Sequence, residues 1–443
     1  MIDYKIINAY IVTVNPEFSI IENGCVCIEN DTIVHICDTC ESHGIEAGTV
    51  IDAQGNLLLP GFINAHTHAA MNIFKGYADD LPLKTWLFDY IFPVEAQFTN
   101  RENVKIGSSL AILEMIASGT TCFVDMYYFV EETAKLCEEI GMRAFLSQPI
   151  VDFAVADANS PDEALQGLET LMQQYQNHNL VQIIPAPHSI YTCSAENFKK
   201  ARALANKYNV ALNTHLSETM EEYNNCMEQH GKTPVEYLND LACFDGKTIA
   251  GHCVYVSEND REILATNRVS AVNNMQSNLK LVCGVSPVPD LLESGVKVCF
   301  GTDSAVSNNS LDMYTEIKTA ALVHKYHSGN ATALNAQQTV FMATLGAAQC
   351  LGIEHLCGSI EIGKKADLQI VNINQIHAVP LYNIYSHIVY ALQGGDVDTV
   401  FINGKCVYLH KQFQGIDAFD VMVRAQELAN TIMEYKEEHS AKI

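Results

Sequence analysis

Two histidines separated by one residue, His66 and His68, stand at the end of an apolar run. Residues i and i+2 of a β-strand point to the same side, so this pair presents two imidazoles in one direction. His215, His252 and Asp303 each follow an apolar run of their own in the same way. Ionisable groups at strand ends are costly to bury without a role. The set therefore predicts an enzyme site rather than satisfied core residues.

Three neutral imidazoles and one carboxylate suit a single divalent metal ion, with water as a further ligand. The expected ligands are His66, His68, His215 and Asp303. Zn²⁺ is the expected ion, and Fe²⁺ and Mn²⁺ are alternatives because affinity and geometry discriminate only in part. Such an ion lowers the pKa of a bound water to about 7 and so makes a nucleophile at neutral pH.

Short apolar runs alternate with amphipathic helical stretches between about residues 57 and 350, which is typical of an α/β protein with a parallel sheet. Eight strands are expected, and eight strands close a (β/α)8 TIM barrel. The active site of this fold lies at the carboxyl ends of the strands, where the histidines and Asp303 stand. The expected strands cover residues 57–66, 120–126, 142–150, 181–187, 209–215, 247–252, 269–274 and 296–302.

The two ends of the chain carry short strands and turns instead. Neither end is long enough for a stable sheet alone, so residues 1–56 and 356–443 are expected to pair into one composite β-sandwich domain beside a barrel at 57–355. A final helix is expected at about 417–437, with Asp417 as its cap. Its apolar residues at helical spacing are Phe419, Met422, Leu428, Ile432 and Met433.

The composition of the 443 residues, 48% apolar and 18% charged, is typical of a globular enzyme. The net charge of −26 argues against nucleic acid or an anionic membrane as partner. No signal peptide or long apolar run is found, so a cytoplasmic enzyme with reduced thiols is expected. Cys37 and Cys40 lack a second pair at zinc-ribbon spacing, so a polar loop is favoured there over a zinc or redox site.

Motifs spread over nearly the whole chain resemble the amidohydrolase superfamily. Within it, the chain is most similar to the branch of 5-methylthioadenosine/S-adenosylhomocysteine deaminases, which is related to the triazine chlorohydrolases. The matching motifs are PGFINAHTHAAM at 60–71, GYADDLPL at 76–83 with Trp86, GTT at 119–121, FVDMY at 123–127, PH at 187–188, YTCS at 191–194, HLSET at 215–219, SNLKL at 277–281, GTD at 301–303 and SNNSLDM at 307–313.

The resemblance implies hydrolytic deamination of an adenine nucleoside at C6, giving an inosine-type product and ammonia. It implies that Asp303 and His252 activate the attacking water and that Glu218 gives a proton to N1. The alternatives are a helix cap or surface carboxylate for Glu218, and a ligand or buried structural role for His252. The stretch 184–188 offers no lysine to bridge two metals, which favours one metal per subunit.

The resemblance also implies three contacts to a small-molecule nucleoside. Trp86 would cover the nucleoside, although a lone tryptophan in an apolar helix is as often core packing. Glu95 would bind the ribose hydroxyls, with a surface-helix carboxylate as the alternative. His188 would face the sugar or the metal site, unless it is a structural histidine. The resemblance further implies a homo-oligomer.

Two departures from the family pattern bear on the substrate. Relatives that accept S-adenosylhomocysteine present an arginine to its carboxylate, but this chain has Gln148 there and no Arg or Lys at 151–165. Methylthioadenosine or adenosine is therefore the expected substrate. The usual His-Asn-Pro is Asn273-Asn274-Met275, which leaves open another heterocycle such as guanine, a pterin or a triazine. A metal-free structural or interaction protein is a remote alternative.

Overall fold

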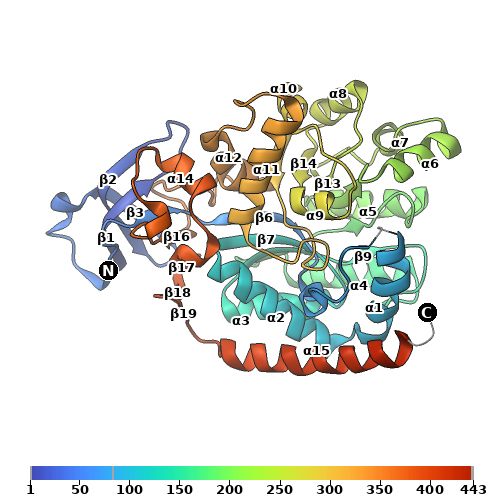
Figure 1. The fold of residues 1–443 in the computed structure, drawn as a ribbon, viewed down its shortest axis with the longest axis horizontal. Coiled ribbons are helices and arrows are strands. Elements are labelled where there is room, and N and C mark those ends of the chain that lie inside the picture. The colour runs from blue at the N-terminus through green and yellow to red at the C-terminus, as the bar shows by residue number, and fades with distance from the viewer. Residues whose placement is uncertain (1, 82–83, 441–443) are drawn as a thin grey trace.

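The computed structural model describes residues 2–81 and 84–440, and it places a barrel beside a sheet built from both chain ends (Figure 1). Pro82 and Leu83 of the GYADDLPL motif lie outside the described residues. Within them, eight parallel barrel strands follow one another in chain order. They are β6 (Phe62–Thr67), β7 (Thr120–Met126), β8 (Arg143–Ser147), β10 (Val181–Ile183), β12 (Leu212–Leu216), β13 (Thr248–His252), β14 (Ser270–Asn273) and β15 (Lys297–Phe300).

The eight strands form two parallel sheets, β10-β8-β7-β6 and β12-β13-β14-β15, that meet at two seams. Short strands β9 (Pro149–Ile150) and β11 (Ala186–Pro187) extend β8 and β10. At one seam the Asn213 amide donates to the Pro185 carbonyl over 2.9 Å, and at the other the Asp303 amide donates to the His66 carbonyl over 3.0 Å. The predicted α/β TIM barrel is thus confirmed.

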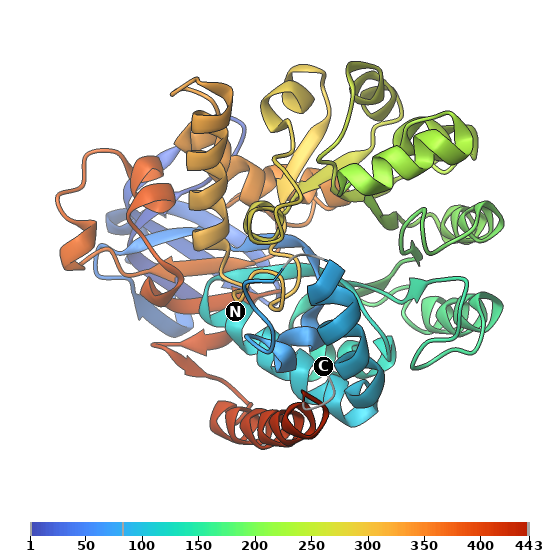
Figure 2. The same cartoon turned by 45° about the vertical axis from the view of Figure 1, so that its right-hand side comes forward.

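Helices surround the strands, as Figure 2 shows. Polar caps begin several of them: Asn100 caps α2 and Ser257 forms a capping box on α8. The helices are α2 (Arg101–Ala117), α3 (Val130–Ile140), α4 (Pro161–Gln174), α5 (Ala195–Tyr208), α6 (Met220–His230), α7 (Pro234–Asp240), α8 (Glu258–Thr266), α9 (Met275–Lys280), α10 (Val288–Glu293), α11 (Met313–Ser328), α12 (Ala336–Ala343) and α13 (Leu345–Leu351).

A register shift in β6 turns the two histidines of the first strand toward the site. Asn64 faces the helix layer, where its amide lies 3.9 Å from the Met115 sulfur of α2. The pairing of β6 with β7 then shifts between Asn64 and Thr67. Two residues after Asn64, the His66 ring packs closely against Gly251 of β13. Such an irregularity re-aims side chains, which strict alternation would have left under the helices.

The composite sheet takes strands from both chain ends, in the order β19-β18-β17-β16-β5-β1-β2-β3, with β4 beside β1. Its two ends approach each other, because Gly404 in the β17–β18 turn lies against the Asn30 carbonyl in the β2–β3 turn. The strands are β1 (Ile2–Val12), β2 (Ile20–Glu29), β3 (Thr32–Asp38), β4 (Ala47–Asp52), β5 (Leu57–Pro60), β16 (Leu368–Val371), β17 (Val397–Ile402), β18 (Lys405–Leu409) and β19 (Gln412–Phe413).

The first predicted barrel strand, 57–66, is wrong as a single element. β5 pairs with β1 and β16 of the composite sheet, and only β6 belongs to the barrel. Gly61 separates the two strands, and a side chain there would collide with Thr121. The division of the chain into domains stays a proposal, for which this pairing favours a boundary at Gly61 rather than at residue 57.

The last helix, α15 (Ala418–Ser440), runs alongside α2 (Figure 1). The Asp417 carboxylate accepts hydrogen bonds from the Phe419 and Asp420 amides, as a cap should. Ile432 is buried, whereas Phe419 is 71% exposed, so only part of the predicted apolar set faces the protein. No helix in the described residues has the length and apolar character needed to cross a membrane.

The remaining short helices connect these elements. The segment that leads to the barrel mouth contains η2 (Ala69–Phe74), the π-helix η3 (Thr85–Ile91) and α1 (Phe92–Phe98). Within the described residues the others are η1 (Thr39–Ser42), η4 (Ile376–Ala378), α14 (Ile384–Tyr390) and η5 (Gly394–Asp396).

Candidate metal centre and active site

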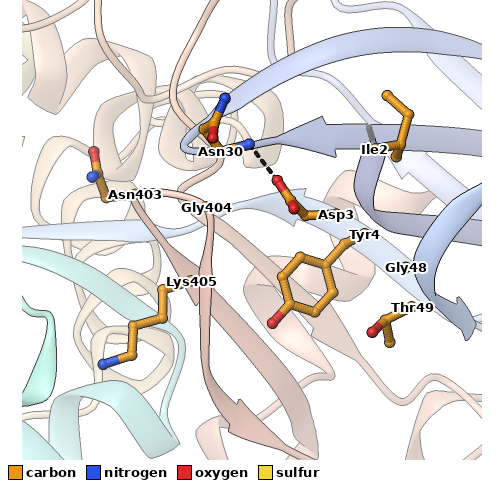
Figure 3. Close-up of a pocket in the computed structure, with 9 residues that line it drawn as sticks. All are labelled: Ile2, Asp3, Tyr4, Asn30, Gly48, Thr49, Asn403, Gly404 and Lys405. Atoms are coloured by element: carbon orange, nitrogen blue, oxygen red, sulfur yellow. Dashed lines mark hydrogen bonds between the residues drawn. The ribbon is translucent and has the colours of Figure 1, made fainter.

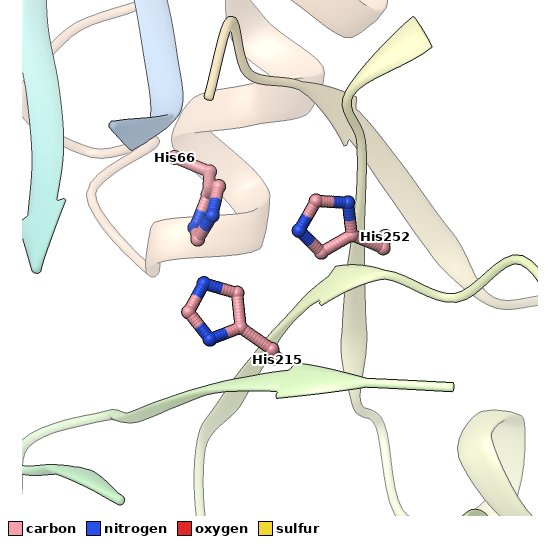
Figure 4. Close-up of side chains that lie close together, drawn as sticks. All are labelled: His66, His215 and His252. Carbon is pink, nitrogen blue, oxygen red and sulfur yellow. The ribbon is translucent and has the colours of Figure 1, made fainter. Parts of the chain in front are cut away.

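Three barrel strands, β6, β12 and β15, bring the predicted ligands together at their carboxyl ends, and β13 adds His252. Figure 4 shows His66, His215 and His252 converging from β6, β12 and β13. The His68 and His215 Nε2 atoms lie 3.3 Å apart, and Asp303 Oδ1 lies 3.2 Å from His68 Nε2. Asp303 Oδ1 is also 3.6 Å from His66 Nε2. Nitrogen and carboxylate atoms at this spacing can share one metal ion.

The ring nitrogens are oriented for metal binding by the backbone. His68 Nδ1 lies 2.7 Å from the Met126 carbonyl, and His215 Nδ1 lies 2.9 Å from the His188 carbonyl. A carbonyl only accepts, so each Nδ1 carries a proton, and Nε2 is the atom of each ring that faces the other ligands. Neither ring nitrogen of the fully buried His66 has a hydrogen-bond partner among the described residues. A buried imidazole nitrogen without a hydrogen-bond partner fits a ligand of a divalent metal.

Burial and charge set the protonation of the cluster. Burial lowers the pKa of His66 to about 4 and the pKa of His215 well below its usual range, so both rings are neutral. Burial also opposes charge on His68, but its bond to Asp303 outweighs burial and raises the His68 pKa to about 9. The attraction of the His66 and His68 rings in turn outweighs burial at Asp303 and holds its pKa well below the usual range. Asp303 is therefore a carboxylate at neutral pH.

Hydroxyl groups fix the second oxygen of Asp303. Its Oδ2 accepts hydrogen bonds from Ser277 Oγ at 2.5 Å and from Ser307 Oγ at 2.9 Å. These donors leave Oδ1 directed at the imidazoles. Sequence patterns identified the carboxylate but not these two serines, although both lie in motifs that resemble the family.

Glu218 lies beside the histidine cluster in a partly buried position. Burial raises its pKa to about 7, and the negative charge of Asp303 adds to the rise. Its Oε2 lies 3.9 Å from His252 Nε2. A carboxyl group that titrates near neutrality can both accept and donate a proton. The surface-carboxylate alternative for Glu218 is not what the structure shows.

Glu222 holds the backbone that carries Glu218. Its carboxylate accepts hydrogen bonds from the Ser217 amide at 3.1 Å and from the Glu218 amide at 2.7 Å. Ser217 has a φ of 51°, in the left-handed region that is strained for a serine. Sequence reasoning missed Glu222, because a glutamate in the first turn of a helix is common on surfaces. Its burial is visible only in the fold.

His252 is fixed on its other side by two amides. The side-chain nitrogens of Asn278 and Asn274 lie 3.0 and 3.3 Å from its Nδ1. Burial lowers the His252 pKa to about 4, so the ring is neutral. Asn274 thus belongs to the site, while the neighbouring Asn273 contacts His324 at 3.4 Å. Of the three residues at 273–275, Asn274 therefore contacts the site, and Asn273 contacts α11 instead.

The three predicted substrate contacts lie in different settings. Trp86 on η3 is buried in an apolar cluster and donates from Nε1 to the Ala78 carbonyl over 3.0 Å, so here it packs as core. Glu95 on α1 accepts a 2.7 Å bond from Tyr127 Oη; burial raises its pKa, against an opposing effect of nearby His68. The His188 ring lies 4.7 Å from the His215 ring, and burial lowers its pKa to about 3.

The side chain at position 148, where the family resemblance implies an arginine for a carboxylate-bearing substrate, is neutral here. Gln148 Nε2 donates to Asp157 Oδ1 over 2.8 Å, and the other Asp157 oxygen accepts from the Phe129 amide. Arg143, at the opposite end of β8, binds Asp367 instead, with its Nε 2.7 Å from the carboxylate. Among the described residues of this loop, the charge next to Gln148 is thus negative.

A depression of about 500 Å³ lies on the composite sheet, between the β2–β3 and β17–β18 turns (Figure 3). Its lining includes Asp3, Tyr4 and Lys405 but no histidine or cysteine among the described residues. Asp3 already accepts a 2.6 Å hydrogen bond from the Asn30 amide. We therefore assign the chemistry to the barrel mouth.

Comparisons with known proteins agree with this geometry. The amidohydrolase family model matches residues 57–407. The 5-methylthioadenosine/S-adenosylhomocysteine deaminase of Thermodesulfovibrio yellowstonii is 41% identical over 94% of this chain and 95% of its own length. The 5'-deoxyadenosine deaminase of Methanosarcina acetivorans is 40% identical over 98% of this chain and 99% of its own. A zinc-bound adenosine deaminase structure from Xanthomonas campestris superposes with a TM-score of 0.96 at 34% identity, covering 98% and 99% of the two chains.

Proposed function

The chain belongs to the amidohydrolase family, and from this premise we propose that it hydrolyses the 6-amino group of an adenine nucleoside to give an inosine-type product and ammonia. The observation that carries the proposal is Glu218, a partly buried carboxyl group with a pKa of about 7 beside the cluster of His66, His68, His215 and Asp303. Such a group can transfer a proton to a ring nitrogen at neutral pH.

The ligand cluster holds the ion that activates the nucleophile, a water molecule. We propose Zn²⁺ as the ion, held by His66, His68, His215 and Asp303 at one site per subunit. When bound, it supplies the Lewis acidity that makes water a nucleophile at neutral pH. The ionised Asp303 and the neutral His252 then orient the attacking water and accept its proton.

Glu218 completes the proton transfers. It donates a proton to N1 of the adenine ring as the water oxygen bonds to C6, so that the ring carbon becomes tetrahedral. The 6-amino group then leaves as ammonia with one proton of the attacking water, the other water proton restores the acid form of Glu218, and the C6 oxygen remains in the product. A carboxyl group with a pKa near 7 suits both directions of this transfer.

The ribose and the 5′ substituent face groups of defined chemistry in the proposal. Glu95 accepts hydrogen bonds from the ribose hydroxyls, His188 faces the sugar, and Trp86 packs the segment that covers the nucleoside. Gln148 with Asp157 offers no cation to a carboxylate, so a neutral 5′ group is preferred. Methylthioadenosine, adenosine and 5′-deoxyadenosine are therefore better substrates than S-adenosylhomocysteine. A cytoplasmic location and a homo-oligomer stay predictions.

A substrate panel tests the proposal. Zinc-loaded protein is mixed with methylthioadenosine, adenosine, 5′-deoxyadenosine and S-adenosylhomocysteine, and the shift of the adenine to the hypoxanthine spectrum is followed. We expect turnover of the first three and at least about tenfold lower kcat/KM for the last, the cost of one missing charged hydrogen bond. Efficient turnover of S-adenosylhomocysteine would contradict the role of Gln148. Guanine serves as the second heterocycle, and turnover of guanine alone would contradict the proposal.

A further inference from the structure

One short segment contacts all three side chains that handle protons in the proposed reaction. Ser277 on α9 donates to Asp303, and Asn278 on the same helix contacts His252. Just after α9, Cys283 Sγ lies 3.7 Å from Glu218 Oε1, with the thiol as the donor. These contacts join residues at three barrel strand ends to a single stretch of seven residues, 277–283.

The position of Cys283 is itself fixed. Its backbone amide donates to the Asn278 carbonyl over 2.9 Å, which closes the turn after α9. The side chain is 4% exposed and packs in the apolar cluster that contains Trp86 and Tyr127. A buried thiol in apolar surroundings stays protonated and can only donate weakly or accept. Facing a carboxylate oxygen, it donates.

We propose that Cys283 is a positioning residue for Glu218, whose Oε1 it holds so that Oε2 stays directed toward His252. The inference rests on the proposed function, because it concerns the orientation of the group that protonates the base. Glu222 fixes only the backbone of Glu218, through the amides of Ser217 and Glu218. The free rotation of the carboxyl group is limited by Cys283 on one side and by the His252 ring, 3.9 Å away, on the other.

This role differs from a catalytic one. Cys283 does not touch the atoms that react in the proposed mechanism; it acts through Glu218. A misoriented proton donor slows the chemical step but leaves the binding contacts of the nucleoside in place. The signature is therefore a lower kcat at an unchanged KM.

The kinetic test compares Cys283→Ala, which removes the donor, with Cys283→Ser, which keeps one. Cys137→Ala is the control, because Cys137 is equally buried but lies in α3 away from these contacts. With zinc-loaded protein we expect Cys283→Ala to lower kcat about tenfold, at a KM within about twofold, and Cys283→Ser to recover kcat to within about threefold. Zinc content should be the same in all variants.

The proposal is overturned if Cys283→Ala keeps the wild-type kcat, if Cys283→Ser falls as far as Cys283→Ala, or if the loss lies in KM alone. A second measurement needs no substrate. The S–H stretching band that is absent from Cys283→Ala should shift in Glu218→Gln, because an amide oxygen accepts more weakly than a carboxylate. An unshifted band overturns the contact. If the wild type deaminates no adenine nucleoside, the proposed function is wrong. The spectrum still shows whether the Cys283 thiol donates to Glu218.

Discussion

Burial acts in opposite directions on the two kinds of titratable group at the site. It lowers the pKa of His66 and His252 to about 4 and raises the pKa of Glu218 to about 7. Both effects have one cause, since a medium of low dielectric disfavours the charged form. His66 is thereby a neutral ligand and His252 a neutral base at a pH where Glu218 still carries a proton part of the time. A single hydrophobic setting thus produces both a metal site and an acid.

The substitution Glu218→Gln tests the acid. The glutamine keeps the volume and one acceptor but cannot transfer a proton. We expect kcat to fall by about 10²–10⁴, the usual contribution of a general acid–base group. Zinc content, measured by elemental analysis, should not change, because Glu218 is not among the proposed ligands. If Glu218→Gln keeps the kcat of the wild type, Glu218 does not transfer the proton.

The substitution Glu95→Gln tests the ribose contact. Glu95 is bound to Tyr127 on one oxygen, which leaves the other for the sugar. We expect the variant to raise KM for adenosine about tenfold, since a hydrogen bond to a charged group contributes about 1.5–3 kcal/mol. With 2′,3′-dideoxyadenosine, which lacks the hydroxyls, wild type and variant should have the same KM. An equal effect of Glu95→Gln on both nucleosides would assign Glu95 to packing.

The ligands were predictable from sequence, and the groups that hold them were not. His66, His68, His215 and Asp303 have side chains that suit a metal and stand at the ends of apolar runs. Glu222, Asn278 and Cys283 are ordinary residue types at unremarkable positions. The contact of Glu222 is local, whereas Asn278 and Cys283 contact residues far away in the chain. Only the folded barrel brings them to the site.

At the scale of elements, the barrel strands were predictable because each is a short apolar run that ends in a polar residue. The break at Gly61 was not, since β5 and β6 are both buried throughout and a fully buried strand shows no alternation. The pairing of β5 with β16, about 310 residues later, likewise leaves no local signal. The end of α15 was predicted within a few residues, yet Phe419 and Met422 are exposed.

Glu316 of α11 fixes the start of α9 and should make stability depend on pH. Its carboxyl accepts hydrogen bonds from the Met275 and Gln276 amides. Burial raises its pKa to about 8 from the ordinary 4.5. A group whose pKa is raised on folding stabilises the protein fully below about pH 4.5, and this contribution is lost as the pH rises through 8.

We therefore expect the free energy of unfolding of the wild type to fall between pH 5 and pH 8. In Glu316→Gln this fall should be smaller by roughly 4 kcal/mol, since one unit of pKa corresponds to about 1.4 kcal/mol. Urea unfolding of the metal-free protein at the two pH values measures it. Glu293→Gln, at an exposed site on α10, is the control. A fall equally steep in Glu316→Gln and in the wild type would contradict this assignment.

At the scale of the whole molecule, the C-terminal part of the chain contacts the barrel at both of its ends. Beneath it, Arg143 of β8 binds Asp367, next to β16, in a buried pair with Nε and Oδ2 2.7 Å apart. At the mouth, Lys436 of α15 donates to the Tyr77 carbonyl over 2.6 Å, in the loop that precedes Trp86. Each of these contacts joins a residue of the first half of the sequence to one of the second half, so neither half alone could have revealed them.

The substitution Asp367→Ala tests the buried pair of Arg143 and Asp367. It leaves the Arg143 charge buried without a partner, which costs about 3–5 kcal/mol of unfolding free energy. Lys365→Ala is the matched control, because its pair with Asp31 is partly exposed and contributes at most about 1 kcal/mol. Unfolding midpoints in urea compare them. Equal midpoints for the two variants would show that the buried pair does not hold the composite sheet to the barrel.

The central claim is metal-dependent hydrolysis at C6 of an adenine nucleoside, and the most direct measurement is the fate of the water oxygen. Zinc-loaded protein is given adenosine in water enriched in ¹⁸O, and the product is examined by mass spectrometry, with Glu218→Gln as the blank. The account predicts an inosine product that carries the heavy oxygen on its base, formed with an equal amount of ammonia. An unaltered base, a base cleaved from its ribose, or a product without the heavy oxygen would contradict it.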